Sequence, residues 1–169
     1  MSNTLITEEQ QYLTFNLADE MFGIEVVQVR EILDVIKITK VPQTPDFMCG
    51  VINLRGNVVP VVDMRLKFGM TKTEKTVDTC IVVMEINVDN ETTILGVLVD
   101  SVEEVIELEQ KDIEPAPKIG TRLRIEFIKG MGKKDDKFII ILNIDKIFSS
   151  EELLMLNKSE KNVEEKEAV

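Results

Sequence analysis

The residue types that usually perform enzymatic chemistry are scarce in this chain. Histidine is absent from all 169 residues, which excludes serine–histidine and cysteine–histidine nucleophilic pairs and imidazole metal sites. Cys49 and Cys80 lie far apart within apolar segments, so we expect buried, unreactive thiols rather than a disulfide or a zinc site. The adjacent carboxylates Glu103 and Glu104 are a poor catalytic pair, because neighbouring residues of one element point in different directions. The sequence therefore favours recognition over reaction.

One cation stands out from this background. Arg55 lies between the apolar residues Val51–Ile52 and the turn residue Gly56, in the segment GVINLRGNVVPVVDMRLKFG. Its guanidinium group offers five hydrogen-bond donors in a rigid fork, which favours a role in binding a partner. The alternative is an internal salt bridge from Arg55 to a carboxylate of this chain, such as Glu31 or Asp63.

Three residues around Arg55 have roles that the sequence leaves open or defines only locally. Glu31 could pair across an interface, or it could be an ordinary solvated carboxylate. Gly50 could permit the close approach of two backbone segments, or it could mark a β-bulge. Asp63 is well placed to accept hydrogen bonds at the start of a short helix, so we assign it to structure.

The overall charge limits the partners that we expect. Acidic residues outnumber basic ones by 31 to 20, which gives a formal net charge of −11. Nucleic acids and anionic membrane surfaces attract concentrated cations, so we expect neither as a partner. No apolar run approaches the roughly 18 residues of a membrane span, and the N-terminus, MSNTLITEEQQ, has no secretory signal. We expect a cytosolic protein without direct membrane insertion.

The elements that must position these residues occur twice along the chain. A shift of 73 residues aligns Met21–Leu33 with Ile94–Ile106 and matches Gly23 with Gly96. Farther along, a shift of 82 residues aligns the sequence VVD, which ends at Asp63, with NID, which ends at Asp145. The sequence therefore predicts two similar subdomains related by duplication.

Each half consists of short apolar segments separated by turns, which indicates a barrel or a sandwich. We expect strands at residues 12–17, 47–54, 58–62, 80–87, 125–129 and 138–144, and further strands that enter through the two matched glycines. Apolar residues near helical spacing follow each glycine, over residues 26–33 and 99–106. In the second half, the polar sequence GMGKKDD replaces NLRG and predicts a longer loop at Gly130–Lys137.

Two short helices are expected, at Asp63–Phe68 and Ser150–Leu156. Ser149 and Glu152 have the spacing of a capping box at the start of the second helix. Residues 157–169 contain too little apolar surface to fold, so we expect a disordered acidic tail there.

The NLRG-containing segment resembles the CheW family of bacterial chemotaxis coupling proteins. The resemblance continues in the same order through YLTFNLADEMFGIEVVQVREI, PQTPDFMCG, ILGVLVDSVEEVIEL, DIEPAP, FIKGMG and IIILNIDKIFSSEELLML, over about residues 10–156. It implies an all-β fold of two packed five-stranded SH3-like β-barrels with an apolar core between them, short helices and a C-terminal helix at 150–156. The N-terminal strand would join the second barrel. We accordingly expect subdomain 1 at about 18–85 and subdomain 2 at about 10–17 plus 86–148.

The resemblance also implies a function, that of a non-enzymatic adaptor without a cofactor. CheW-like proteins bind the cytoplasmic hairpin tip of methyl-accepting chemoreceptors and the regulatory domain of the histidine kinase CheA. They hold both in arrays at the inner face of the membrane, so that receptor state controls autophosphorylation.

Seven residues of this chain match functional positions of the family. The receptor-binding groove, which would accept an amphipathic helix, would contain Leu13, Val26, Val29 and Ile32. Coupling to receptor and kinase would involve Glu31, Gly50 and Arg55. For the apolar four, the alternative is that they are simply core residues.

Two other functions stay open at this point. A CheW-like scaffold of a receptor–kinase pathway other than chemotaxis would have the same sequence features. A small-ligand-binding or enzymatic barrel would instead use paired carboxylates such as Glu103 and Glu104. It would show a deep polar pocket with perturbed acids, whereas an adaptor would show a shallow apolar groove.

Overall fold

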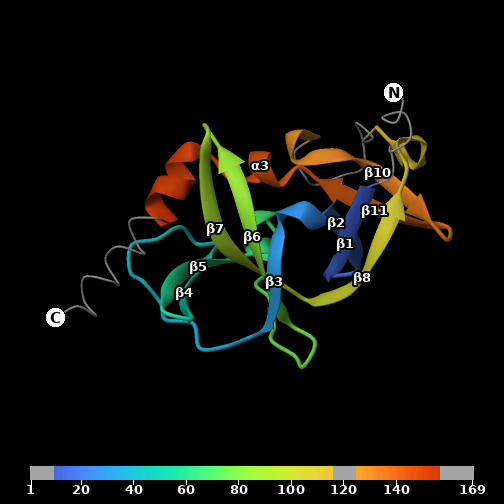
Figure 1. The fold of residues 1–169 in the computed structure, drawn as a ribbon. Helices are drawn as coiled ribbons and strands as arrows, with labels where there is room; N and C mark the ends of the chain where they lie inside the picture. The colour runs from blue at the N-terminus through green and yellow to red at the C-terminus, as the bar shows by residue number, and fades with distance from the viewer. Residues whose placement is uncertain (1–9, 116–124, 157–169) are drawn as a thin grey trace.

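The structure, a computed structural model, describes residues 10–115 and 125–156 as two curved β-sheets with a few helical turns (Figure 1). The strands are β1 (Gln10–Leu17), β2 (Glu20–Glu25), β3 (Val29–Asp34), β4 (Met48–Leu54), β5 (Asn57–Asp63), β6 (Cys80–Val88), β7 (Glu91–Val99), β8 (Ser101–Leu108), β9 (Ile113–Glu114), β10 (Ile128–Lys134) and β11 (Lys137–Leu142). The helical elements are the 3₁₀ turns η1 (Val26–Gln28), η2 (Gln110–Asp112) and η3 (Ile125–Phe127), the helices α2 (Met64–Lys67) and α3 (Ile144–Ile147), and a helix over residues 150–156.

The strands form one five-stranded and one six-stranded sheet, in the orders β3-β6-β7-β5-β4 and β8-β1-β2-β11-β10-β9. In each sheet, the segment that follows one edge strand pairs at the opposite edge, and this pairing curls the sheet into a barrel. Thr39, beyond β3, forms a bridge to Val51 of β4, and β9, beyond β8, pairs with β10. The expected all-β fold of two barrel-like halves is confirmed.

The N-terminal strand lies in the second sheet, where β1 pairs with both β2 and β8. The chain nevertheless divides between the sheets at points that differ from the expected ranges 18–85 and 86–148. β2 stays with β1 in the six-stranded sheet, and β7 stays with β6 in the five-stranded sheet. The cause is local, because two-residue turns join β1 to β2 and β6 to β7, and such tight hairpins keep adjacent strands paired.

Strand pairing supports the duplication and corrects its register. Val61 pairs with Gly96 in the first sheet, and Ile141 pairs with Gly23 in the second. Because the two glycines are equivalent, Val61 corresponds to Ile141, a shift of 80 residues rather than 82. Asp63 therefore matches Asn143, and each residue precedes a short helix.

The corrected register removes the long loop expected at Gly130–Lys137. The segment up to Lys134 continues as β10, and only Asp135 and Asp136 form the turn to β11. Glycine and lysine are unfavourable in strands, so the local pattern did not indicate one. In the barrel, a Cβ at Gly132 would lie 2.7 Å from Leu108 Cδ1, so close packing explains that glycine.

Three other local expectations differ from the structure. Residues 26–33 form η1 and β3, and residues 99–106 form the end of β7 and most of β8, so the helix-like spacing does not produce helices. Residues 125–127 form the turn η3 instead of the start of a strand. The edge strands β3 and β8 gain backbone partners that override the helix-like spacing, whereas residues 125–127 precede the pairing of β10, which begins at Ile128.

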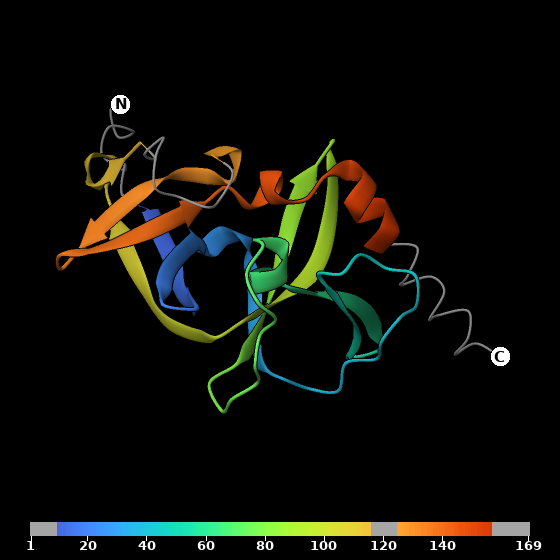
Figure 2. The same cartoon turned by 180° about the vertical axis from the view of Figure 1, so that it is seen from behind.

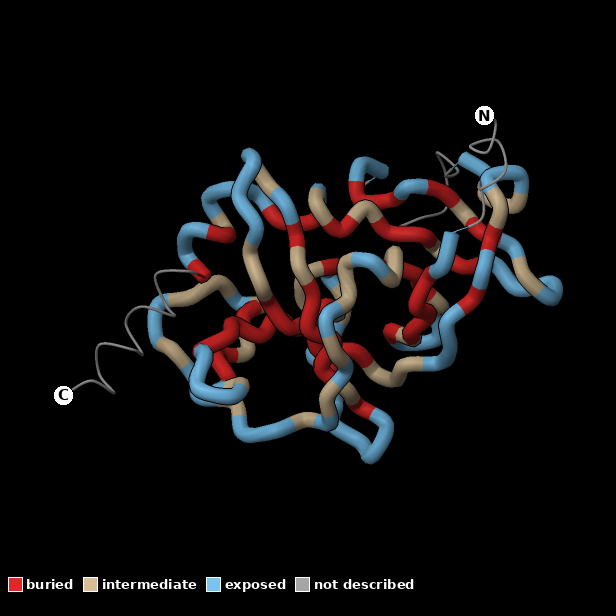
Figure 3. The backbone as a smooth tube through the Cα atoms, in the orientation of Figure 1, coloured by how far each residue is buried: buried red, intermediate tan, exposed pale blue. Residues whose placement is uncertain are grey.

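The apolar core has three parts, one inside each barrel and a larger one between them. The part between the barrels combines residues of both sheets, and Figure 3 shows the buried stretches meeting in the middle of the molecule. Phe22 stands at its centre, with ring centroids 5.8 Å from Phe15 and 5.8 Å from Phe68. The two halves are thus joined by a continuous apolar interior.

The helix at residues 150–156 begins with the predicted capping box. The Glu152 N–H donates to Ser149 Oγ at 3.1 Å, and the Ser149 N–H donates to Glu152 Oε1 at 2.8 Å. Leu153 and Leu156 are buried in the core between the barrels. Both views place this helix beside the five-stranded sheet (Figures 1 and 2). The expected tail at 157–169 lies outside the described residues.

Candidate functional site

Arg55 lies at the tip of the β4–β5 hairpin, in a two-residue turn with Gly56. Their φ angles are 52° and 88°, so both residues adopt the left-handed conformation that tight hairpins require. This conformation suits Gly56 but is unfavourable for a residue with a Cβ atom. The turn is braced by the Gly56 N–H, which donates to Asn53 Oδ1 at 2.9 Å.

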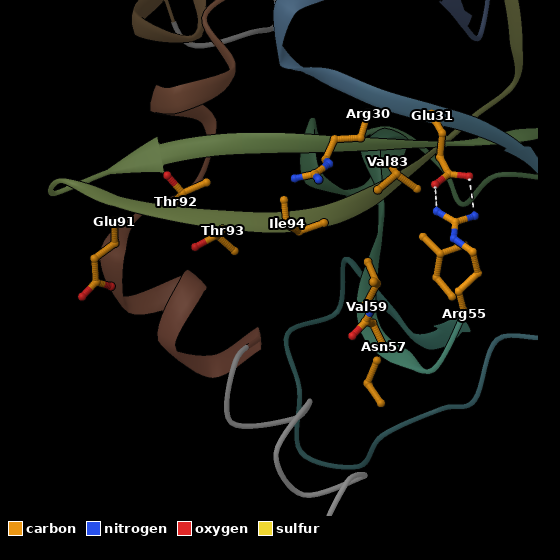
Figure 4. A pocket seen from close by; sticks show the side chains of 12 residues that line it. Arg30, Glu31, Arg55, Asn57, Val59, Val83, Glu91, Thr92, Thr93 and Ile94 are labelled. Atoms are coloured by element: carbon orange, nitrogen blue, oxygen red, sulfur yellow. Dashed lines mark hydrogen bonds and ion pairs between the residues drawn. The ribbon is translucent and has the colours of Figure 1, made fainter.

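Across the sheet from this turn, Arg55 forms a two-pronged ion pair with Glu31 of β3 (Figure 4). Arg55 Nη1 donates to Glu31 Oε1 at 3.2 Å, and Nη2 donates to Oε2. The hydrogen bond from Arg55 lowers the pKa of Glu31 below its ordinary value. The Arg55 side chain is still 70% exposed, against 26% for Glu31. The internal salt bridge therefore exists, with Glu31 and not Asp63, but it leaves much of the guanidinium group accessible.

The ion pair borders a hollow of about 440 Å³ at one end of the first barrel. Its lining residues come from β3, β6, β7 and the β4–β5 hairpin and are Arg30, Glu31, Leu54, Arg55, Asn57, Val58, Val59, Val83, Glu91, Thr92, Thr93 and Ile94. Figure 4 shows Arg30 and Thr92–Ile94 along one side and Arg55 on the other. Arg30 is itself paired with Glu85. The hollow thus combines charged side chains with buried valines.

The four predicted groove residues do not share one environment. Val26 and Val29 are half-buried and pack against the core between the barrels, and Ile32 is 44% exposed. Leu13 is only 3% exposed, because its strand lies between β2 and β8 in the second sheet. Val26, Val29 and Ile32 can therefore belong to a surface, whereas Leu13 is a core residue.

Sequence reasoning missed Val27, which is 84% exposed in the turn η1. Its neighbour Gln28 holds this turn in place, since Gln28 Nε2 donates to Asp145 Oδ1 of α3 at 2.9 Å. The signal was present in the sequence, because two consecutive apolar residues, Val26 and Val27, cannot both face one interior. The apolar surface on this edge therefore extends farther than the groove positions alone.

Gly50 has a structural role in closing the first barrel. Its φ angle is 144°, and a Cβ there would lie 2.2 Å from the carbonyl oxygen of Thr39. The register of β4 and β5 also shifts between Met48 and Gly50. Gly50 thus provides both the close approach and the bulge that the sequence left open. The residue is buried.

The described residues provide little for catalysis. Among them, no group of three or more histidine, cysteine, aspartate or glutamate side chains is placed to hold a metal ion. Burial raises the pKa of Cys49 to about 11, so its thiol stays protonated at neutral pH. Glu103, one of the paired carboxylates, accepts hydrogen bonds from Asn16 and Ser101. In residues 10–115 and 125–156, no helix has the length and apolar character that crossing a membrane requires.

Both barrels are filled by their own side chains, such as Ile52, Val61 and Ile81 in the first and Tyr12 and Ile141 in the second. A barrel that binds a small ligand needs space there instead. The fold is thus a pair of filled β-barrels with a shared apolar core and an exposed, ion-paired hairpin turn.

Comparison with known proteins identifies the family. The family model of the CheW-like domain matches residues 11–152 of this chain. Chemotaxis protein CheW of Klebsiella aerogenes is 33% identical over 156 residues, which are 92% of each chain. CheW of Helicobacter pylori is 34% identical over 145 residues, covering 85% of this chain and 84% of the relative. The chain belongs to the CheW family, whose members are non-enzymatic scaffold proteins of chemotaxis.

A solved structure agrees with this assignment. The crystal structure of the scaffolding protein TtCheW from Thermoanaerobacter tengcongensis matches with a TM-score of 0.73 and 36% sequence identity. The match covers 85% of this chain and 90% of that one. The two-sheet architecture is therefore the architecture of this family.

Proposed function

We propose that this chain couples the cytoplasmic hairpin tips of chemoreceptors to the regulatory domain of the histidine kinase CheA, in arrays at the inner face of the membrane. The observation that most supports this role is the Arg55 side chain, which is 70% exposed and is oriented by its ion pair with Glu31 of β3. Ile32, the next residue on β3, points to the opposite face of the strand from Glu31, so this edge strand presents charge on one face and apolar surface on the other.

The apolar part of this surface suits the tip of a receptor helix. Val26 and Val29 are half-buried, and Val27 and Ile32 are exposed, on a single segment from η1 into β3. An amphipathic helix binds such a surface by burying its apolar residues against aliphatic side chains. Leu13 is excluded from this contact because it is buried.

The charged part suits recognition by the kinase and signal coupling. The ion pair with Glu31 engages two donors of the Arg55 guanidinium, and within the described residues no other hydrogen bond to it is formed. The other donors are available to a carboxylate or a carbonyl group of a partner. The ion pair would therefore orient the Arg55 side chain and leave its remaining donors available to a partner.

Binding measurements with the two partners test this proposal. The wild-type chain should bind both a receptor-tip fragment and the CheA regulatory domain, measured separately by calorimetry. Ile32→Lys should weaken binding of the receptor fragment at least tenfold, because it places a charge in an apolar contact. Val77→Lys is the control, because Val77 is 96% exposed on the loop before β6. Failure of the wild-type chain to bind either partner would contradict the proposal.

A further inference from the structure

A larger hollow, which the proposed function does not use, lies on the second barrel where the segment from Arg65 to Thr71 meets it. Its volume is about 1150 Å³, and it contains none of the residues Glu31, Ile32 and Arg55. Its apolar lining consists of Met21, Phe68, Met70, Met131, Phe138 and Ile140, with Ile128 beside them. Phe138 is 56% exposed. A large aromatic side chain exposed beside several methionines is typical of a surface that binds a partner.

The internal duplication identifies the matching face of the first barrel. With a shift of 80 residues, Phe138 of β11 corresponds to Val58 of β5, and Met131 of β10 corresponds to Val51 of β4. Val58 is only 7% exposed and Val51 only 3%. The same face is therefore covered on the first barrel and open on the second.

The C-terminal helix provides the cover on the first barrel. Leu153 and Leu156 are buried in the same core cluster as Val51 and Val58. Glu152 fixes the helix through an ion pair with Lys67 of α2 at 2.9 Å. Figures 1 and 2 both place the helix beside the five-stranded sheet. In this half, a helix of the chain itself packs into the part of the core that contains this face.

The second barrel has no such helix among the described residues. The C-terminal helix follows Phe148, whose equivalent at a shift of 80 is Phe68. After Phe68 the chain turns at Gly69, which has a φ angle of 78°, and continues without a helix to β6. The face that a helix covers on one barrel is thus left without its helix on the other.

We propose that the hollow on the second barrel is a docking site for an amphipathic helix of another protein, with basic residues beside its apolar face. The charge of the rim indicates this chemistry. Asp19, Glu20 and Glu103 line the hollow, and the first two form no ion pair within the described part of the chain. Two basic residues also line it, Lys137 and Arg65, and the Arg65 guanidinium is paired with Asp100 at 2.7 Å. Acidic side chains still outnumber basic ones on the rim by three to two.

The C-terminal helix of a second copy is a poor occupant for the same reason. Its first turn contains Glu151 and Glu152, which would approach the acidic rim. Like charges facing each other across an interface oppose binding. The charges of the rim and of this helix therefore favour a different, basic helix.

Methionine-methyl NMR on the full chain tests the site directly. The probe is a 14-residue helical peptide of leucine, alanine and lysine, with leucines on one face, and its matched control has glutamate in place of lysine. The lysine peptide should shift the methyl signals of Met21, Met70 and Met131, which line the hollow. It should bind at least tenfold more tightly than the glutamate peptide. Absence of these shifts at millimolar peptide would overturn the proposal.

Two substitutions of equal charge separate this site from general attraction to an acidic protein. Phe138→Lys should weaken the lysine peptide at least tenfold, whereas Leu154→Lys should leave binding unchanged, although the two parent side chains are 56% and 58% exposed. Circular dichroism should show both variants folded, because both positions are on the surface. Equal binding by the two variants would overturn the proposal. Concentration-dependent shifts of the same methyls without peptide would also overturn it, by assigning the hollow to a second copy.

Discussion

Arg55 and Asp135 occupy equivalent positions at the tips of the β4–β5 and β10–β11 hairpins, with φ angles of 52° and 51°. The two turns have the same left-handed geometry, and only the side chains differ. A shift of 80 residues relates them, as it relates Gly50 to Gly130. The barrel therefore requires a left-handed residue at this point but not an arginine, which favours a functional role for Arg55.

Arg55→Asn distinguishes the role of this residue in the hairpin turn from its role in contacting a partner. Asparagine adopts the left-handed conformation more readily than arginine, so the free energy of unfolding should not fall, even though the ion pair with Glu31 is lost. Coupling of the kinase to receptors should weaken, because the guanidinium group is gone. Urea denaturation and a reconstituted kinase assay measure the two effects. A large loss of stability with normal coupling would assign Arg55 to the fold alone.

Gly50→Ala should destabilise the first barrel strongly. A Cβ atom there would lie 2.2 Å from the carbonyl oxygen of Thr39, so the backbone must shift, and we expect a loss of at least about 2 kcal/mol in the free energy of unfolding. Gly56→Ala is the control, because no atom lies within 4 Å of a Cβ at that position and only its positive φ is unfavourable. It should cost about 1 kcal/mol. Equal losses in urea denaturation would show that the barrel can relax around Thr39.

Asp63→Ala should cost far more stability than Asn143→Ala, although the two residues are equivalent. The buried Asp63 carboxylate accepts hydrogen bonds from the N–H groups of Arg65 and Thr73 and from the Thr73 hydroxyl, at 2.7–3.0 Å. Removing it leaves buried donors unpaired, so we expect a loss of roughly 2–4 kcal/mol. Asn143 makes no side-chain cap, so its substitution should cost less than about 1 kcal/mol. Thermal unfolding of both variants provides the comparison.

The attachment of the C-terminal helix should depend on pH through Glu152. Burial raises the pKa of this carboxyl, but hydrogen bonds from the Ser149 backbone and from Lys67 outweigh it, so the pKa lies below its ordinary value of 4.5. A carboxyl with a lowered folded-state pKa stabilises the fold above its unfolded-state pKa. That stabilisation is lost as pH falls through the folded-state pKa.

Glu152→Gln provides the control for this pH dependence. The variant should be less stable than the parent at pH 7, and the difference should shrink progressively below about pH 4.5. Urea denaturation at a series of pH values measures it. A difference that stays constant down to pH 2 would show that the charge of Glu152 does not fix the helix.

The sequence predicted the elements that depend on local pattern. The strands β4, β5 and β6 and the capping box of Ser149 and Glu152 lie where alternation and spacing indicated. The duplication at Gly23 and Gly96 was also visible, because both glycines face crowded barrel interiors. A Cβ at Gly96 would lie 2.8 Å from Ile81 Cγ2.

Features set by contacts between distant segments were not predictable in this way. Leu13 resembles a groove residue in sequence but is buried, because strand order places β1 inside a sheet. Strand propensity did not predict β10 because it contains Gly132. That glycine is needed because Leu108 fills the space where a side chain would lie. Lys67 Nζ lies 5.0 Å from the ring centroid of Phe47 and forms an ion pair with Glu152, which is 85 residues away along the chain. No local pattern connects those residues.

Exchange of the two charges in the Arg55–Glu31 pair tests whether Arg55 contacts a partner, with receptor-controlled CheA activity in a reconstituted array as the readout. Arg55→Glu should reduce coupling, and the double variant Arg55→Glu/Glu31→Arg should not restore it, because the cation no longer stands on the hairpin turn. Lys111→Glu, which breaks the exposed Lys111–Glu109 pair, is the control and should couple normally. Full restoration by the double variant would show that the pair acts only within the fold, and would contradict a partner contact by Arg55.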